Sequence, residues 1–173
     1  LDIIRDVPKD QTIALSKNPN LSVTVSSGLL MVYMAIDSVG KSGHPALKKE
    51  KVREAMMMAI DRHSLVKNII PGGEGAVVMD AMCMRFMVGC DFSTTPPAFN
   101  PAKAKKLLAE AGFANGFDLV ISATAAVRQI AEAAANFLRD IGVRADVNVL
   151  TFPAYRKRQR SGKIQVLLHF WTA

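Results

Sequence analysis

The segment Met79–Cys90, MDAMCMRFMVGC, concentrates sulfur-bearing side chains, because four methionines lie among two cysteines. Thioether and thiolate ligands suit Cu(I), so a soft-metal site is one interpretation. Apolar loop packing is the other, because methionine is a flexible side chain that fills irregular gaps. Cys83 and Cys90 can be bridged in an oxidising compartment, although nothing requires it. The three histidines lie far away in sequence, which disfavours zinc, and we expect no metal or other cofactor.

A second concentration of chemistry is the basic run Arg156–Arg160, RKRQR, on a short predicted helix. Phosphate contacts in nucleic-acid complexes need such charge. However, Phe152 and Tyr155 precede the run instead of alternating with it, and the sequence contains no RNA-binding or DNA-binding module. We therefore expect a solvated helix face and no nucleic-acid partner. The alternative is a stand-alone basic α/β module that binds nucleic acid or another polyanion.

The sequence lacks the motifs that build common active sites. It has no GxSxG, no P-loop, no HExxH and no G-x-G-x-x-G after a strand. His63 has no evident catalytic partner, and no nucleophile is paired with a base. These absences favour a binding protein over an enzyme.

Length and composition are those of a globular chain of one domain or a little more, with 173 residues of which 50% are hydrophobic. The formal net charge of +7 comes mostly from basic residues spread along the chain, as on a solvated surface. No apolar run is long enough to span a membrane. Leu1–Asp10 lacks the basic and apolar regions of a signal peptide. Its first residues already follow the pattern of a structured segment, so we expect the chain to be a segment of a longer protein.

The first half of the chain predicts mainly helices and one β-rich stretch. Apolar residues in Lys49–Ile60 recur at helical spacing, and Asp61 is placed to cap a following helix over Arg62–Ile70. Gly75–Phe99 has weak periodicity and predicts a long loop. The preceding elements are predicted as a strand, a helix and a β-rich stretch over Asp2–Arg5, Lys9–Lys17 and Leu21–Asp37.

Strands and helices alternate in the second half. Asn100 caps a helix that has Pro101 in its first turn and ends at Gly112. The next helices are long enough for right-handed crossovers, so we expect a single α/β domain with a mostly parallel sheet flanked by helices. These elements are predicted over Phe117–Ala123, Val127–Ile141, Val143–Leu150, Phe152–Arg160 and Ile164–Trp171.

Ligands of open α/β folds gather beyond the carboxyl ends of the strands. The turn Thr124–Arg128 follows one predicted strand, and the end of the last strand is expected at the same cleft. Arg128 can hold a ligand carboxylate in bidentate fashion, or it is an ordinary solvated charge. Trp171 lines the site, or it is an ordinary buried aromatic. The candidate ligand-binding residues are His169, Phe170, Trp171, Thr172, Thr124 and Arg128.

Several short patterns follow one another in a fixed order. The most specific pair is VREAMMMAID at Val52–Asp61, followed by NPAKAKKLLAEAG at Asn100–Gly112. The chain resembles peptide-type (dipeptide/oligopeptide) extracytoplasmic solute-binding proteins of ABC importers, family 5, over nearly all of its length. The further matching patterns are DIIRDVP at Asp2–Pro8, the glycine run Gly72–Gly75, GF at Gly116–Phe117, IGV at Ile141–Val143 and SGKIQVLLHFW at Ser161–Trp171.

The resemblance implies one lobe of a two-lobe fold that closes on its ligand like a hinged trap. The chain corresponds to the C-terminal lobe, lobe II, and the other lobe is absent from it. The backbone near Trp171 is implied to pair with an extended peptide, with the indole forming a pocket wall. Asp61 and Arg53 are implied to be structural, one as a helix cap and the other as an ion-pair partner across a turn.

The implied function is binding of peptides, or of a related small solute, as the substrate-binding component of an ABC transporter. The implied partner is an inner-membrane permease, the implied location is the periplasm, and we expect a monomer. The chain departs from the family at Ala35–Asp37 and at Met82–Met84, the latter near the ligand face. Relatives take nickel chelates, haem or oligosaccharides, so the ligand stays open.

Overall fold

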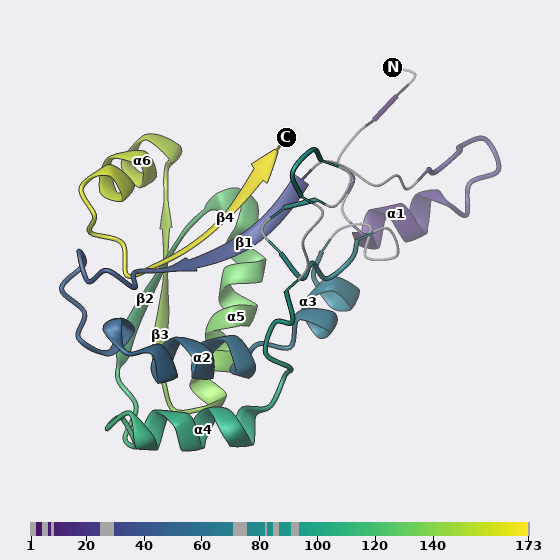
Figure 1. The fold of residues 1–173 in the computed structure, drawn as a ribbon. Coiled ribbons are helices and arrows are strands. Elements are labelled where there is room, and N and C mark those ends of the chain that lie inside the picture. The colour runs from purple at the N-terminus through teal and green to yellow at the C-terminus, as the bar shows by residue number, and fades with distance from the viewer. Residues whose placement is uncertain are drawn as a thin grey trace.

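The computed structural model describes residues 3–4, 7, 9–24, 30–70, 76–81, 83–84, 87–90 and 94–172. Figure 1 shows a twisted sheet with most of the helices gathered on one side and α6 apart from them. The elements in chain order are α1 Lys9–Leu15, β1 Leu30–Ile36, η1 Ala46–Lys48, α2 Glu50–Ala59, α3 Arg62–Asn68, α4 Pro101–Glu110, β2 Asp118–Thr124, η2 Ala125–Val127, α5 Arg128–Asp140, β3 Arg144–Leu150, α6 Phe152–Arg160 and β4 Val166–Thr172.

The sheet has the strand order β1-β4-β2-β3. β2 is parallel to both β3 and β4, whereas β1 is antiparallel to β4. The α/β class with a mostly parallel sheet is therefore confirmed, and α5 and α6 are the crossovers between the parallel strands.

Side chains alternate between the two faces of the sheet, as the two-residue period of a strand requires. On β2, Leu119, Ile121 and Ala123 belong to the main hydrophobic core. Ser122 and Thr124 therefore lie on the opposite face, the one that α6 covers, and both are buried. One face of the sheet is consequently apolar and the other carries buried polar groups.

Helix α5 supplies small residues to the core. Ala131, Ala134 and Ala135 are fully or almost fully buried and lie on the side of α5 that packs against β2 and β3. Methyl side chains let the helix backbone approach the sheet closely, and Leu138 fills the space at the end of the helix. Helix α2 packs against α5 and carries α4 on its outer side.

Side-chain caps fix the ends of the helices beside the core. Asp61 accepts a hydrogen bond from the Ser64 backbone N at 3.0 Å, so its predicted role as a helix cap is confirmed. Asn100 caps α4 by accepting from the Lys103 N at 2.9 Å, and it ties α4 to α2 by donating its own N–H to the Met58 carbonyl at 2.8 Å.

Arg53 does not form the ion pair that was expected of it. Its Nη1 donates to the carbonyl oxygens of Leu47 and Lys48, at 2.9 and 2.8 Å. Those carbonyls belong to η1, which has too few residues to satisfy them internally, so the guanidinium serves as a cap. The residue is structural, as expected, but its partners are backbone groups.

The turns that precede β2 and β3 touch at a pair of glycines. Gly116 has a φ of +69°, and a Cβ at this position would lie 1.8 Å from the carbonyl oxygen of Gly142. Only glycine allows both the conformation and the contact. The contact brings the starts of the two parallel strands together, and Arg144 N then donates to Phe117 O at 2.9 Å.

The sequence analysis predicted more β-structure in the N-terminal part than the described residues contain. Within the β-rich stretch, residues 25–29 lie outside the described residues. The described strand is Leu30–Ile36, where β4 supplies a partner, and Leu21–Thr24 are exposed outside any strand. Of the strand expected near the start, only Ile3 and Ile4 are described, and neither is in a strand. The glycine run Gly72–Gly75 lies outside the described residues. None of the helices in the described ranges is both long and apolar enough to cross a membrane.

Candidate functional site

Because β2, β3 and β4 are parallel, their carboxyl ends meet at one edge of the molecule, near the C-terminus in Figure 1. The last pair between β2 and β4 is Ala123 with Leu168. β4 then continues to Thr172 with β1 as its partner, in the register Tyr33 to His169 through Leu30 to Thr172. Along this stretch no described strand pairs with the other side of β4, although η2 contacts the strand.

The four predicted residues of β4 divide between the two faces of the sheet. Phe170 packs against the main hydrophobic core together with its cross-strand partner Val32, so its ring is a core side chain. His169 and Trp171 lie on the opposite face, where the cross-strand partner of Trp171 is Met31. Trp171 is 50% exposed, which argues against an ordinary buried aromatic. Thr172 is exposed at the end of the strand.

A cluster of buried polar atoms lies beneath this edge. Tyr155 is fully buried, and its ring centroid lies 4.7 Å from that of His169. The Tyr155 hydroxyl, His169 Nδ1 and the Thr124 hydroxyl have no hydrogen-bond partner among the described residues. Buried polar groups normally have partners, so these three are suited to ordered water or to a polar group of a ligand.

The same environment shifts two pKa values. Burial lowers the pKa of His169 below its ordinary value of 6.5, and the nearby Arg156 guanidinium lowers it further. Burial raises the pKa of Tyr155 to about 12, with Tyr33 adding to the rise and Arg156 opposing it. Near neutral pH the site therefore presents a neutral imidazole and a neutral phenol, which can exchange hydrogen bonds with a ligand without a change of charge.

Arg128 begins α5, one turn after Thr124. Its Nε pairs with Glu132 Oε1 at 2.7 Å on the same helix, and both side chains are largely exposed. This hydrogen bond raises the pKa of the guanidinium. The structure thus places Arg128 near the carboxyl edge with its charge directed to its own helix. Nothing in the geometry assigns it a ligand.

Phe152 is a neighbour that the sequence analysis did not select. It begins α6 directly after β3, at the same carboxyl edge, and it is 58% exposed. The Arg156 guanidinium lies 6.0 Å from the centre of its ring, within reach of a cation–π interaction. The rule that selected Thr124 could have selected Phe152, because Phe152 also follows the end of a predicted strand.

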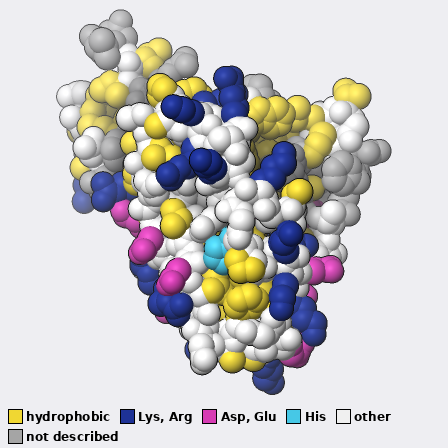
Figure 2. Space-filling model, turned by 90° about the vertical axis from the view of Figure 1, so that its left-hand side faces the viewer, with side chains coloured by type: hydrophobic (Ala, Val, Ile, Leu, Met, Phe, Trp, Pro, Cys, Tyr) yellow, Lys and Arg dark blue, Asp and Glu magenta, His cyan; other side chains and the backbone are white. Residues whose placement is uncertain are grey.

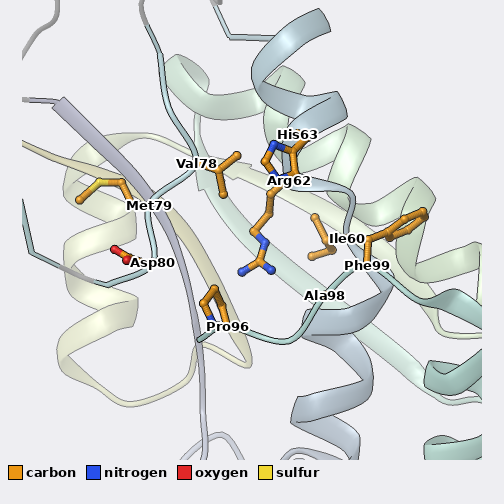
Figure 3. A pocket seen from close by; sticks show the side chains of 9 residues that line it. All are labelled: Ile60, Arg62, His63, Val78, Met79, Asp80, Pro96, Ala98 and Phe99. Atoms are coloured by element: carbon orange, nitrogen blue, oxygen red, sulfur yellow. The ribbon is translucent and has the colours of Figure 1, made fainter. Parts of the chain in front are cut away.

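A cavity of about 360 Å³ lies elsewhere, between the start of α3 and the loop that precedes α4 (Figure 3). Arg62 reaches across it and donates to the Pro97 carbonyl, and the Thr94 hydroxyl bonds to the Asp80 carbonyl. None of the six predicted ligand-binding residues lines it. Its lining consists of Ile60, Arg62, His63, Val78, Met79, Asp80, Pro96, Ala98 and Phe99.

The sulfur-rich segment holds a disulfide between Cys83 and Cys90. The thiolates that the soft-metal interpretation needed are therefore absent, and that interpretation is wrong in its ligand set. Met79, Met84 and Met87 are partly buried, as loop packing predicts, while Met82 lies outside the described residues. Within the described ranges, no group of three or more His, Cys, Asp or Glu side chains is placed to hold a metal.

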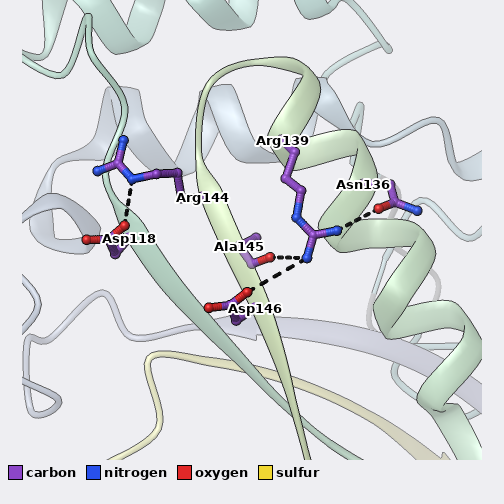
Figure 4. Close-up of polar contacts among 6 residues, drawn as sticks. All are labelled: Asp118, Asn136, Arg139, Arg144, Ala145 and Asp146. Carbon is purple, nitrogen blue, oxygen red and sulfur yellow. Dashed lines mark hydrogen bonds and ion pairs between the residues drawn. The ribbon is translucent and has the colours of Figure 1, made fainter.

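The polar contacts at the opposite, amino end of the sheet are structural. Arg144 Nε pairs with Asp118 Oδ1 at 2.6 Å, joining the first residues of β2 and β3 (Figure 4). Arg139 donates to Asn136 Oδ1 at 2.7 Å and to the Ala145 carbonyl, which ties α5 to β3. The carboxylates involved are exposed, so each ion pair contributes little to stability.

Curated relatives are similar to most of this chain. The di/tripeptide-binding protein 1 of Pseudomonas aeruginosa is 26% identical over 166 residues, which make up 92% of this chain and 30% of that protein. The glutathione-binding protein GsiB of Salmonella typhimurium is 28% identical over 151 residues, which make up 83% of this chain and 27% of that protein.

Solved structures show the same fold. The periplasmic binding protein DppA of Helicobacter pylori, in complex with the peptide STSA, is 26% identical with a TM-score of 0.78. The match covers 95% of this chain and 31% of that one. A dipeptide-binding protein of Pseudoalteromonas, in complex with Met-Leu, is 26% identical with a TM-score of 0.72, covering 96% of this chain and 33% of that one.

The chain spans about a third or less of the length of these relatives. The family model for the middle part of bacterial extracellular solute-binding proteins, family 5, matches residues 1–173. The curated relatives named above are binding proteins for di/tripeptides and for glutathione. The chain belongs to the family 5 bacterial extracellular solute-binding proteins.

Proposed function

We propose that this chain is one lobe, lobe II, of the substrate-binding component of an ABC importer, and that the ligand is a peptide or a related small solute. The observation that carries the proposal is the end of β4, where the backbone beyond Leu168 has a strand partner on one side only among the described residues. The relatives named for di/tripeptides and for glutathione support the same class of ligand.

In this proposal an extended peptide adds to the free side of β4 as a short strand. Backbone hydrogen bonds supply affinity that tolerates sequence variation, and side-chain pockets set the preference. Trp171 forms one pocket wall from the same face as His169. Thr124 and the Tyr155 hydroxyl lie beneath the edge with unused hydrogen-bonding capacity, which a ligand group or a bound water can take up.

Closure of a second lobe over the peptide completes the site. Ligand that is buried between two lobes stabilises the closed form by its differential affinity for that form. The whole of residues 1–173 acts as one domain in this scheme, as a binding protein without catalytic activity. The further partner is an inner-membrane permease, and the protein works as a monomer in the periplasm.

Titration calorimetry with the full-length polypeptide that carries this chain tests the strand-addition step. The probe is a tripeptide and its analogue with an ester in place of one of its two backbone amides, which removes one N–H donor without adding bulk. If the missing N–H of the peptide donates to a buried carbonyl of β4, the ester analogue is expected to bind roughly tenfold more weakly or worse. Equal affinities of the two compounds, with affinity governed by side chains alone, would contradict pairing with β4.

A further inference from the structure

The last part of the chain carries positive charge without negative charge. Residues 147–173 contain five lysines and arginines and no aspartate or glutamate. All five basic side chains are exposed, and none forms an ion pair with any residue that the structure describes. They lie on α6 and just after it: Arg156, Lys157, Arg158, Arg160 and Lys163.

A sixth charge joins them from a distant part of the sequence. The Lys41 side chain passes over Gly162, within 3.0 Å of the place where a Cβ would stand. Lys41 is exposed, so its ammonium adds to the same surface. Together, Lys41 and the five residues of α6 and its C-terminal turn form what we name the α6 basic surface.

Figure 2 views the molecule from the side on which α6 lies in Figure 1. Dark-blue lysine and arginine side chains lie over the upper and the lower parts of this face, whereas magenta carboxylates are seen only at mid-height and below. The surface also carries an exposed aromatic ring, because Phe152 is 58% exposed beside the Arg156 guanidinium. It therefore combines unpaired cations with one apolar group at its edge.

We propose that the α6 basic surface binds the anionic phospholipid headgroups of a membrane and holds the protein at the bilayer. A cluster of about 4–8 lysines and arginines suffices for such binding, and it requires charge density without a shaped pocket. The exposed ring of Phe152 suits the boundary between headgroups and acyl chains, where interfacial helices bury Trp, Phe and Leu side chains. Single-stranded nucleic acid fits less well, because its binding relies on several aromatic platforms for stacked bases.

This inference goes beyond the proposed function and does not depend on it. Peptide is expected at the end of β4, whereas Lys157 and Arg158 are exposed residues of α6. Retention at the bilayer would raise the local concentration of the protein beside any membrane partner. Each lysine or arginine at the surface strengthens the association by about fivefold.

Co-sedimentation of the full-length polypeptide with vesicles tests the proposal. Vesicles of phosphatidylglycerol and phosphatidylcholine are compared with vesicles of phosphatidylcholine alone, at low and at moderate salt. The double variant Lys157→Gln/Arg158→Gln is expected to lower the partition coefficient on the anionic vesicles by about 25-fold. The matched control is Lys105→Gln/Lys106→Gln, which removes the same charge from exposed positions on α4. It is expected to stay within about twofold of the wild type because α4 lies far from α6 (Figure 1).

Three results would overturn the proposal. One is equal binding of the wild type to charged and neutral vesicles. Another is an equal loss in both double variants, which would show an effect of net charge alone. The third is salt-sensitive binding to DNA that the α6 variant loses, without vesicle binding, which would assign the surface to nucleic acid. Calorimetric peptide binding measured on the same variants keeps a failure here separate from a failure of the proposed function.

Discussion

His169 lies in an environment that disfavours its charged form. Its pKa is lowered by burial first and by Arg156 second, so the unfolded chain takes up a proton at a higher pH than the folded chain does. The free energy of unfolding therefore falls as the pH drops through 6.5 toward the lower pKa of the folded state, and the loss ends once both states are protonated.

Guanidinium unfolding curves from about pH 8 to about pH 5 check this sign. We expect wild-type stability to decline on acidification and the variant His169→Gln to decline less steeply. A His169→Gln variant with the full wild-type slope would show that the pH dependence arises elsewhere.

Tyr155 tests whether the buried polar cluster is needed for folding. Its hydroxyl is buried without a described partner, so removing it leaves no donor or acceptor unpaired in the protein. We expect Tyr155→Phe to change the free energy of unfolding by less than about 1 kcal/mol, and Tyr155→Ala to lower it by about 3–5 kcal/mol through the cavity that it creates. A large loss in Tyr155→Phe would instead reveal a tightly held water on the hydroxyl.

At the scale of elements, the paired starts of β2 and β3 depend on the glycine contact between their preceding turns. Gly116→Ala places a methyl group against the Gly142 carbonyl at a positive φ, so the backbone must shift. We expect a loss of at least about 2 kcal/mol in urea unfolding. Gly142→Ala is the matched control, because it shares the positive φ but meets no atom within 4 Å. Equal losses of stability in the two variants would mean that the positive φ alone, without the contact with the Gly142 carbonyl, causes the destabilisation.

Elements with a regular hydrophobic period were predictable from the sequence. Alternation over Val143–Leu150 predicted β3, and the helical repeat before Asp61 predicted α2 together with its boundary. The limits of β1 were not predictable, because its length is set by pairing with β4, some 130 residues later in the chain. Local sequence cannot show where such a distant partner begins and ends.

The candidate site was predictable only in outline. The carboxyl-end rule pointed to one edge of the sheet, and the structure places Trp171 at that edge, while ligand binding there stays a prediction. The two-residue period could also have separated Phe170, which belongs to the core, from its neighbours. The buried cluster of Tyr155 with Thr124 and His169 could not be foreseen, because its three members come from separate elements that meet only in the folded chain.

At the scale of the whole molecule, β1 and β4 run past the rest of the sheet as an antiparallel pair (Figure 1). The beginning of β1 and the end of β4 lie side by side, since Leu30 pairs with Thr172. The side of β4 that no described strand pairs with lies next to this end of the pair. This arrangement fits the proposal that ligand is buried between lobes, and that one lobe alone holds it weakly.

Native mass spectrometry with a mixture of di-, tri- and tetrapeptides tests the central claim most directly. The same mixture is offered to the full-length polypeptide and to residues 1–173 alone. The account predicts one peptide per full-length polypeptide and no retained peptide on residues 1–173, because affinity requires burial by both lobes. Submillimolar peptide binding by residues 1–173 alone would contradict the two-lobe mechanism. A full-length polypeptide that retains no peptide and carries nucleic acid instead would contradict the proposed function itself.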